Sequence, residues 1–184
     1  MSNSTQAKRA SAAVAAVDTG PAGHETAAEE RQFAAQTWLL IAAKDGPAAQ
    51  LDWHSADVTL LRCGTLFTAI RVPLPLIEAA AGTNDREKIG AYLNAVLFRG
   101  AAFLDKPSEN VYFLVPQSTW GRWVEPETEC LSPDMRLGVP RPGAKPDERA
   151  YWLVEMDGPG DLCARDAVKA LVEYGRLRAV QADG

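Results

Sequence analysis

Residues 62–81 read RCGTLFTAIRVPLPLIEAAA, and the fold that the sequence predicts is organised around this stretch. Gly64 marks a turn, and the apolar run Leu66–Val72 that follows is typical of a short buried strand. Pro73 and Pro75 end this strand because proline lacks the backbone N–H that strand pairing needs, and both residues favour the first turn of a helix. We therefore expect a central strand followed directly by a helix.

The remainder of the chain shows pairs of strand patterns separated by helix patterns. Such an order is typical of an α+β fold, here with a mixed β-sheet and flanking helices. The strand before Gly64 could pair with the central strand as a hairpin. The further expected helices cover residues 25–44, 86–98 and 163–178, and the further expected strands cover residues 58–61, 101–104, 111–115, 135–139 and 150–154.

The first and last of these helices are expected to be amphipathic. In the helix over residues 25–44, Phe33, Trp38 and Ile41 recur at helical spacing, which predicts that Trp38 faces inward. Gly46-Pro47 is expected to end this helix. In the last helix, the predicted inner stripe consists of Ala167, Leu171, Tyr174 and Leu177.

Composition indicates one domain preceded by a tail. Residues 1–24 contain no Phe, Trp or Tyr and are rich in small and polar residues, so we expect a disordered tail before a single domain over residues 25–180. No apolar run approaches the roughly 20 residues that span a bilayer, and we see no secretion signal. Three scattered cysteines without metal-ligand spacing are typical of free thiols in a reducing compartment. We therefore predict a cytoplasmic protein.

Three stretches, one of them within residues 62–81, carry a resemblance to a known family. They are CGTLFTAIRVP at 63–73, YFLVP at 112–116 followed by Trp120 and Trp123, and RLGVPRP at 136–142 followed by YWL at 151–153. Over residues 50–178 the chain resembles the bifunctional DNA primase/polymerase N-terminal domain of bacteria, a branch of the archaeo-eukaryotic primase superfamily. The resemblance implies a primase/polymerase-like α+β fold.

The chain departs from this family at the end of its central strand. The resemblance implies two acidic residues, one residue apart, whose carboxylates would hold two divalent cations for nucleotidyl transfer. This strand instead contains Thr68 and Arg71. A threonine supplies no charged ligand, and an arginine repels a cation. We therefore expect no catalytic residues, metal or cofactor, as in a degenerate relative.

Two sets of side chains are candidates for binding a ligand or partner. Trp120, Arg122 and Trp123 could stack on a base or grip a partner protein, and the tryptophans would share a face if this segment is helical. The alternative is that both tryptophans cover the core. Arg62, Arg71 and Arg122 could line one cleft that binds a phosphate or carboxylate, although solvated arginines are the default. Thr68, which lies on the central strand with Arg71, is a further candidate for contact with a ligand or partner.

Three functions remain open from the sequence. The leading one is a non-catalytic primase/polymerase-like module that binds or regulates. The second is a metal-dependent nucleotidyltransferase that uses unrecognised acidic residues. The third is an accessory protein that binds a protein or small molecule and has no nucleic-acid role. Because the net charge is −5, we expect a protein or small-molecule partner before duplex DNA, whose binding rests on many Lys and Arg contacts to phosphate.

Overall fold

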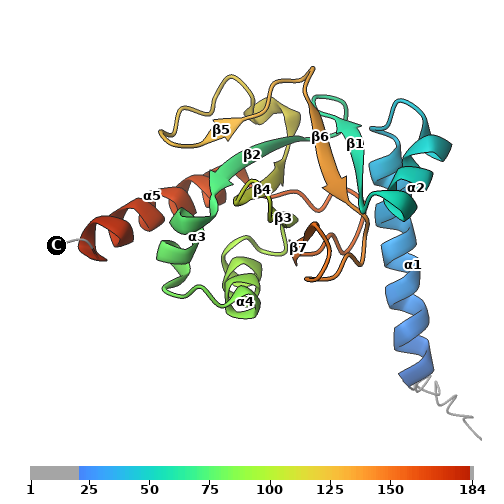
Figure 1. Ribbon diagram of the computed structural model, residues 1–184, viewed down its shortest axis with the longest axis horizontal. Helices are drawn as coiled ribbons and strands as arrows, with labels where there is room; N and C mark the ends of the chain where they lie inside the picture. Colours follow the sequence, from blue (N-terminus) through green and yellow to red (C-terminus); the bar gives the residue numbers. More distant parts are fainter. Residues whose placement is uncertain (1–20, 183–184) are drawn as a thin grey trace, which may run out of the picture.

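Helices lie on both sides of a twisted antiparallel sheet in the computed structural model, which describes residues 21–182, with side chains from residue 27 onward. Figure 1 shows the arrangement. The helices are α1 (Pro21–Leu40), α2 (Gly46–Ser55), α3 (Leu74–Ala81), α4 (Arg86–Val96), α5 (Arg165–Ala182) and the short 3-10 helix η1 (Gln117–Thr119). The strands are β1 (Val58–Arg62), β2 (Thr68–Pro73), β3 (Ala102–Asp105), β4 (Asn110–Val115), β5 (Glu129–Cys130), β6 (Arg136–Pro140) and β7 (Ala150–Val154).

The predicted α+β class is confirmed, but the prediction of a mixed sheet is wrong. A five-stranded sheet has the order β5-β2-β4-β3-β7, β1 and β6 form a two-stranded sheet, and every strand pair in residues 21–182 is antiparallel. The crossover through α3 and α4 does join two parallel strands, β2 and β3, which is the connection that parallel strands require. The chain then turns back, and β4 inserts between β2 and β3 and pairs antiparallel with both.

The predicted hairpin between β1 and the central strand is also wrong. β1 pairs with β6 over the whole register from Val58–Pro140 to Arg62–Arg136. After β1 the chain makes a tight turn in which the Gly64 N–H donates to the Phe67 carbonyl oxygen at 2.7 Å. This turn carries β2 into the other sheet, so β1 and β2 are neighbours in sequence without being paired.

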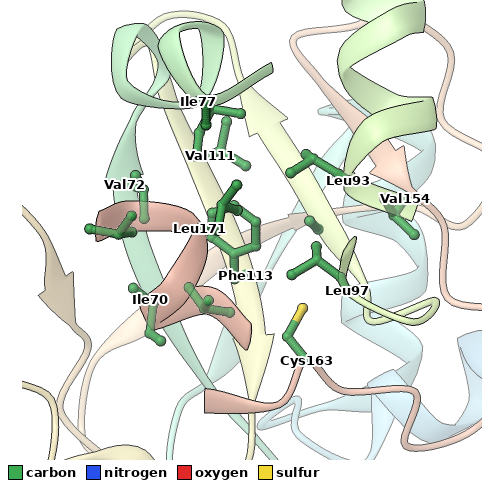
Figure 2. Close-up of a cluster of buried hydrophobic side chains, with 14 of the residues drawn as sticks. Ile70, Val72, Ile77, Leu93, Leu97, Val111, Phe113, Val154, Cys163 and Leu171 are labelled. Atoms are coloured by element: carbon green, nitrogen blue, oxygen red, sulfur yellow. The ribbon is translucent and has the colours of Figure 1, made fainter. Parts of the chain in front are cut away.

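The central strand is confirmed as the middle of the core, because its side chains pack alternately on both faces of the sheet. Ile70 and Val72 lie in one apolar cluster with residues of α3, α4 and α5. Figure 2 shows Ile70, Phe113 and Leu171 pointing toward one another in this cluster. On the opposite face, Ala69 joins a second cluster that includes residues of α1, α2 and β6.

The N-terminal helix differs from its prediction at both ends. α1 begins at Pro21, so the last residues of the predicted tail are helical, while residues 1–20 of that tail lie outside the described residues. α1 ends at Leu40, and Gly46-Pro47 lies in the first turn of a second helix, α2. Proline is tolerated there because the first N–H groups of a helix have no intrahelical partner. The Asp45 carboxylate caps α2 by accepting from the Ala48 N–H at 3.0 Å.

The buried face of α1 is made by small and aliphatic residues. Ala35 and Leu39 are fully buried, whereas Phe33 is exposed, contrary to the predicted stripe. Trp38 is partly buried and lies 6.0 Å from Phe67 between ring centroids, so it faces inward as predicted.

The predicted inner stripe of the last helix is only partly correct. α5 buries Val168, Leu171, Val172 and Gly175, whereas Tyr174 and Leu177 are exposed. Gly175 allows α5 to approach α3 closely, because a Cβ atom there would lie 2.5 Å from the Leu76 carbonyl oxygen. The face of α5 that packs on α3 is therefore set by this glycine.

Candidate functional site

The hydroxyl group of Thr68 is used inside the protein. Thr68 is fully buried, and its Oγ1 donates a 2.6 Å hydrogen bond to the Leu131 carbonyl oxygen. The same hydroxyl interacts with the thiols of Cys63 and Cys130. Burial raises the pKa of the Cys63 thiol and raises that of Cys130 to about 11, and the Thr68 hydroxyl opposes both shifts. Thr68 therefore bonds to the loop after β5 and does not face solvent.

Arg71 lies at the surface and has a charged partner on the neighbouring strand. Its Nη2 lies 2.8 Å from Glu129 Oε2, and the side chains are 46% and 47% exposed. An ion pair this exposed contributes about 0–1 kcal/mol to stability. The strand end that the family resemblance assigns to metal ligands thus holds a buried hydroxyl and a guanidinium paired with a carboxylate. Among the side chains of residues 27–182, no group of three or more His, Cys, Asp and Glu residues could hold a metal ion.

The segment 117–128, which we name the tryptophan loop, is held together by its own side chains. It follows β4 and Pro116 and begins with η1. Trp123 Nε1 donates to Thr128 Oγ1 at 2.8 Å, and Thr128 Oγ1 donates to the Glu125 carbonyl oxygen at 2.8 Å. These two bonds close the second half of the loop on itself.

A carboxylate of the tryptophan loop anchors it to helix α5. Glu125 is 8% exposed, and its two oxygens accept from Lys169 Nζ at 2.5 Å and Arg176 Nη2 at 2.6 Å. The hydrogen bond from Lys169, followed by that from Arg176, lowers the pKa of the Glu125 carboxyl, and Glu125 in turn raises the pKa of Lys169. We call these three residues the Glu125 clamp.

Beside this loop lies an open groove of about 450 Å³, which we name the tryptophan groove. Trp120 and Val124 line it and are 50% and 83% exposed. Trp123 lies on the inner side, where it also packs against the core cluster under α5. Glu129, the partner of Arg71, forms part of the lining, so Arg71 is at the rim. The groove thus presents apolar side chains to solvent on a segment that the Glu125 clamp fixes.

The structure separates the two interpretations of the tryptophans. The helical turn ends at Thr119, so Trp120 and Trp123 do not share a helical face. Trp123 is partly buried against the core, as the packing interpretation expects, whereas Trp120 is half exposed, as the binding interpretation expects. Arg122 is exposed between them.

The three candidate arginines do not meet in one cleft. Arg62 lines a different groove, beside the turn after α1, and its Nη2 lies 2.8 Å from Asp134 Oδ1. Arg71 is held by Glu129 at the rim of the tryptophan groove. Arg62 therefore belongs to a separate surface.

The Glu125 clamp was not found by sequence reasoning. Lys169 and Arg176 are seven residues apart, a spacing that places both side chains on one face of a helix and could have been noticed. Their partner comes from a turn-rich segment with no regular pattern, so the sequence gives no signal for it.

Searches of protein-family models, of curated proteins and of solved structures find no match to this chain. In the part of the chain that the structure describes, no helix combines the length and apolar character needed to cross a membrane.

Proposed function

We propose that this protein is a non-catalytic binding or regulatory module with a primase/polymerase-like fold, and that Trp120 is its main partner contact. The observation that carries the proposal is the half-exposed Trp120 side chain on a loop that the Glu125 clamp fixes to α5. Tryptophan is among the residues that contribute most to binding energy at interfaces. A contact residue on a fixed loop loses little conformational entropy on binding, which favours affinity.

The two residues of the central strand support a role without catalysis. The Thr68 hydroxyl is already bonded to Leu131, and Arg71 places a positive charge where the family resemblance implies a metal-binding carboxylate. The resemblance itself rests on the three sequence stretches described above.

The net charge of the chain supports a protein or small-molecule partner. Glu125 and Glu129 line the groove but are paired with cations, Glu125 with Lys169 and Arg176 and Glu129 with Arg71, so the relevant charge is the net charge of −5. A net negative charge opposes binding to duplex DNA, because DNA affinity rests on neutralising many phosphates. A cytoplasmic location belongs to this proposal as well.

Two experiments test the proposal. Primer extension and de novo synthesis with Mg²⁺ or Mn²⁺ should give no polynucleotide, and robust metal-dependent incorporation would establish the nucleotidyltransferase alternative instead. Partners captured from the source cell with the wild-type protein should be retained less by Trp120→Ala, with a loss of at least about 1 kcal/mol when affinity is measured with the purified partner.

The matched control for the capture experiment is Phe33→Ala. Phe33 is an aromatic residue of α1 that is 68% exposed, and it does not line the tryptophan groove. The Phe33→Ala variant should retain as much partner as the wild-type protein does. Equal loss in both variants would mean that exposed aromatic area, and not this groove, retains the partner.

A further inference from the structure

A second groove, of about 460 Å³, lies between the turn after α1 and the β1–β6 sheet, and we name it the basic groove. Its lining includes three cationic side chains, Lys44, Arg62 and Arg136, and one carboxylate, Asp134. It also includes two aliphatic side chains, Ile41 and Leu60. This surface is separate from the tryptophan groove.

Strand pairing and a backbone hydrogen bond bring the cations together. Arg62 and Arg136 are directly opposite each other in the antiparallel β1–β6 pair. The Arg62 N–H donates to the Ala42 carbonyl oxygen at 2.9 Å, which fixes the turn that carries Lys44 against β1. Like charges directly opposite in a sheet destabilise it, so this arrangement has a cost in stability.

The positive charge of the groove is only partly neutralised. Asp134 pairs with Arg62 at 2.8 Å, and this carboxylate is itself 88% exposed. Within residues 27–182, neither Lys44 nor Arg136 has a carboxylate within ion-pair distance. In a chain with a net charge of −5, this leaves a local excess of positive charge.

Apolar surface accompanies these cations. Ile41 and Leu60 are 61% and 55% exposed although both are large aliphatic residues. They come from the turn after α1 and from β1, and both line the basic groove. A ligand that fills this groove can therefore bury an apolar group and neutralise positive charge at the same time.

We propose that the basic groove binds an acidic peptide segment of a partner protein. An apolar side chain of the peptide packs on Ile41 and Leu60, while its Asp or Glu residues pair with Lys44 and Arg136. Arginine also forms bidentate pairs with carboxylates, which gives geometric selectivity. The proposal goes beyond the function assigned to the tryptophan groove, because it uses other residues and another kind of ligand.

The chemistry of the groove favours a peptide over a nucleic acid. Single-stranded nucleic acids are held by aromatic side chains that stack on bases along a positively charged path. The apolar part of the basic groove is aliphatic and comes from Ile41 and Leu60, so the groove offers no aromatic ring on which a base could stack.

The test is selection of peptides from a random displayed library with the wild-type protein as bait. Enriched sequences should carry Asp or Glu around a bulky apolar residue. Synthetic versions should bind by fluorescence polarisation, and the double variant Lys44→Glu/Arg136→Glu should weaken this binding by at least about 10-fold, equal to about 1.4 kcal/mol.

The matched control is Lys145→Glu/Arg178→Glu, which makes the same charge change at two exposed cations outside the basic groove. It should change the affinity less than about 2-fold, which is under half a kcal/mol. Lys44 and Arg136 are exposed, and Arg136→Glu removes the like-charge pair with Arg62, so the double variant should melt at or above the wild-type temperature. If it does not, Lys44→Gln/Arg136→Gln replaces it in the same assay.

Four outcomes would overturn the proposal. One is that no acidic motif is enriched, and another is that the selected peptides bind both double variants equally well. The third is that a single-stranded oligonucleotide binds more tightly than the selected peptides and loses affinity in Lys44→Glu/Arg136→Glu. The fourth is loss of peptide binding in Trp120→Ala alone, which would assign the peptides to the tryptophan groove and leave the basic groove without a ligand. Primer-extension activity, by contrast, bears on the proposed function and not on this groove.

Discussion

The hydroxyl of Thr68 and the carbonyl oxygen of Leu131 are joined by a 2.6 Å hydrogen bond in the protein interior. This bond ties the end of the central strand β2 to the loop after β5. The same strand end is where the family resemblance implies carboxylates that hold metal ions. In this chain the Thr68 side chain at that position stabilises the fold, and the free energy of unfolding should depend on its hydrogen bond to Leu131.

Thr68→Val should lower the free energy of unfolding by about 1–3 kcal/mol, because the Leu131 carbonyl oxygen would stay buried without its donor. Urea unfolding followed by circular dichroism measures this change. Thr65→Val is the control, since Thr65 is exposed. Equal unfolding midpoints for the two variants would show that the bond does not contribute.

Trp120→Ala and Trp123→Ala should differ in stability. Trp123 packs on the core and donates to Thr128, so its removal should lower the free energy of unfolding by about 1–3 kcal/mol. Trp120 is half exposed, and its removal should change this free energy by less than about 0.5 kcal/mol. Thermal unfolding of the two purified variants measures both values. Comparable destabilisation by both would place Trp120 in the core and remove it from the proposed binding surface.

Glu125→Gln should lower the melting temperature at neutral pH and lose this effect in acid. The folded-state pKa of Glu125 lies below its ordinary value of 4.5, because Lys169 and Arg176 stabilise the carboxylate. Its stabilising contribution is therefore fully present above about pH 4.5 and is lost as the pH falls through the lowered pKa. Melting curves of wild type and variant should converge in this acid range.

The control for the clamp is Glu127→Gln, an exposed carboxylate of the same loop. It should melt like the wild type at every pH. If Glu125→Gln lowers the melting temperature by the same amount at every pH, the shape of the Glu125 side chain, and not its charge, explains the effect.

The three thiols should react slowly in the folded protein. Burial raises the pKa of Cys163 to about 12 and that of Cys130 to about 11, and it also raises that of Cys63. Only the thiolate reacts with disulfide reagents, so at mildly alkaline pH the reactive fraction is small. Labelling with a chromogenic disulfide should be slow in native protein and fast in urea. Rapid labelling of one native thiol would show that its surroundings open to solvent.

Local patterns predicted the elements around β2 well. The strand, the helix after Pro73, helix α4 and the strands β3 and β4 all follow from neighbouring residues, and each is present. The β1–β6 pair could not be predicted in this way, because its strands are about seventy residues apart in the chain and their pairing depends on tertiary packing. The prediction that Gly46-Pro47 ends the first helix is wrong because a Gly-Pro pair can end one helix or begin the next, and here it begins α2.

The candidate site was predictable in part. Trp120 and Trp123 stood out by residue type, but their different exposure depends on Thr128 and on the Glu125 clamp, which are contacts across the fold. The basic groove combines a turn, β1 and β6, so no single stretch of sequence contains it.

Because strand β5 is very short, the molecule should resist aggregation through the edge of its sheet at high concentration. β2, a six-residue strand, would be the outermost strand of the sheet if β5 and the residues after it did not cover its edge. β5 itself has only two residues, and the Leu131 N–H continues the cover by donating to the Ala69 carbonyl oxygen at 2.9 Å. A long bare edge invites another chain to add a strand, whereas a very short edge strand offers few free backbone groups. The fold thereby protects its central strand from edge-to-edge aggregation.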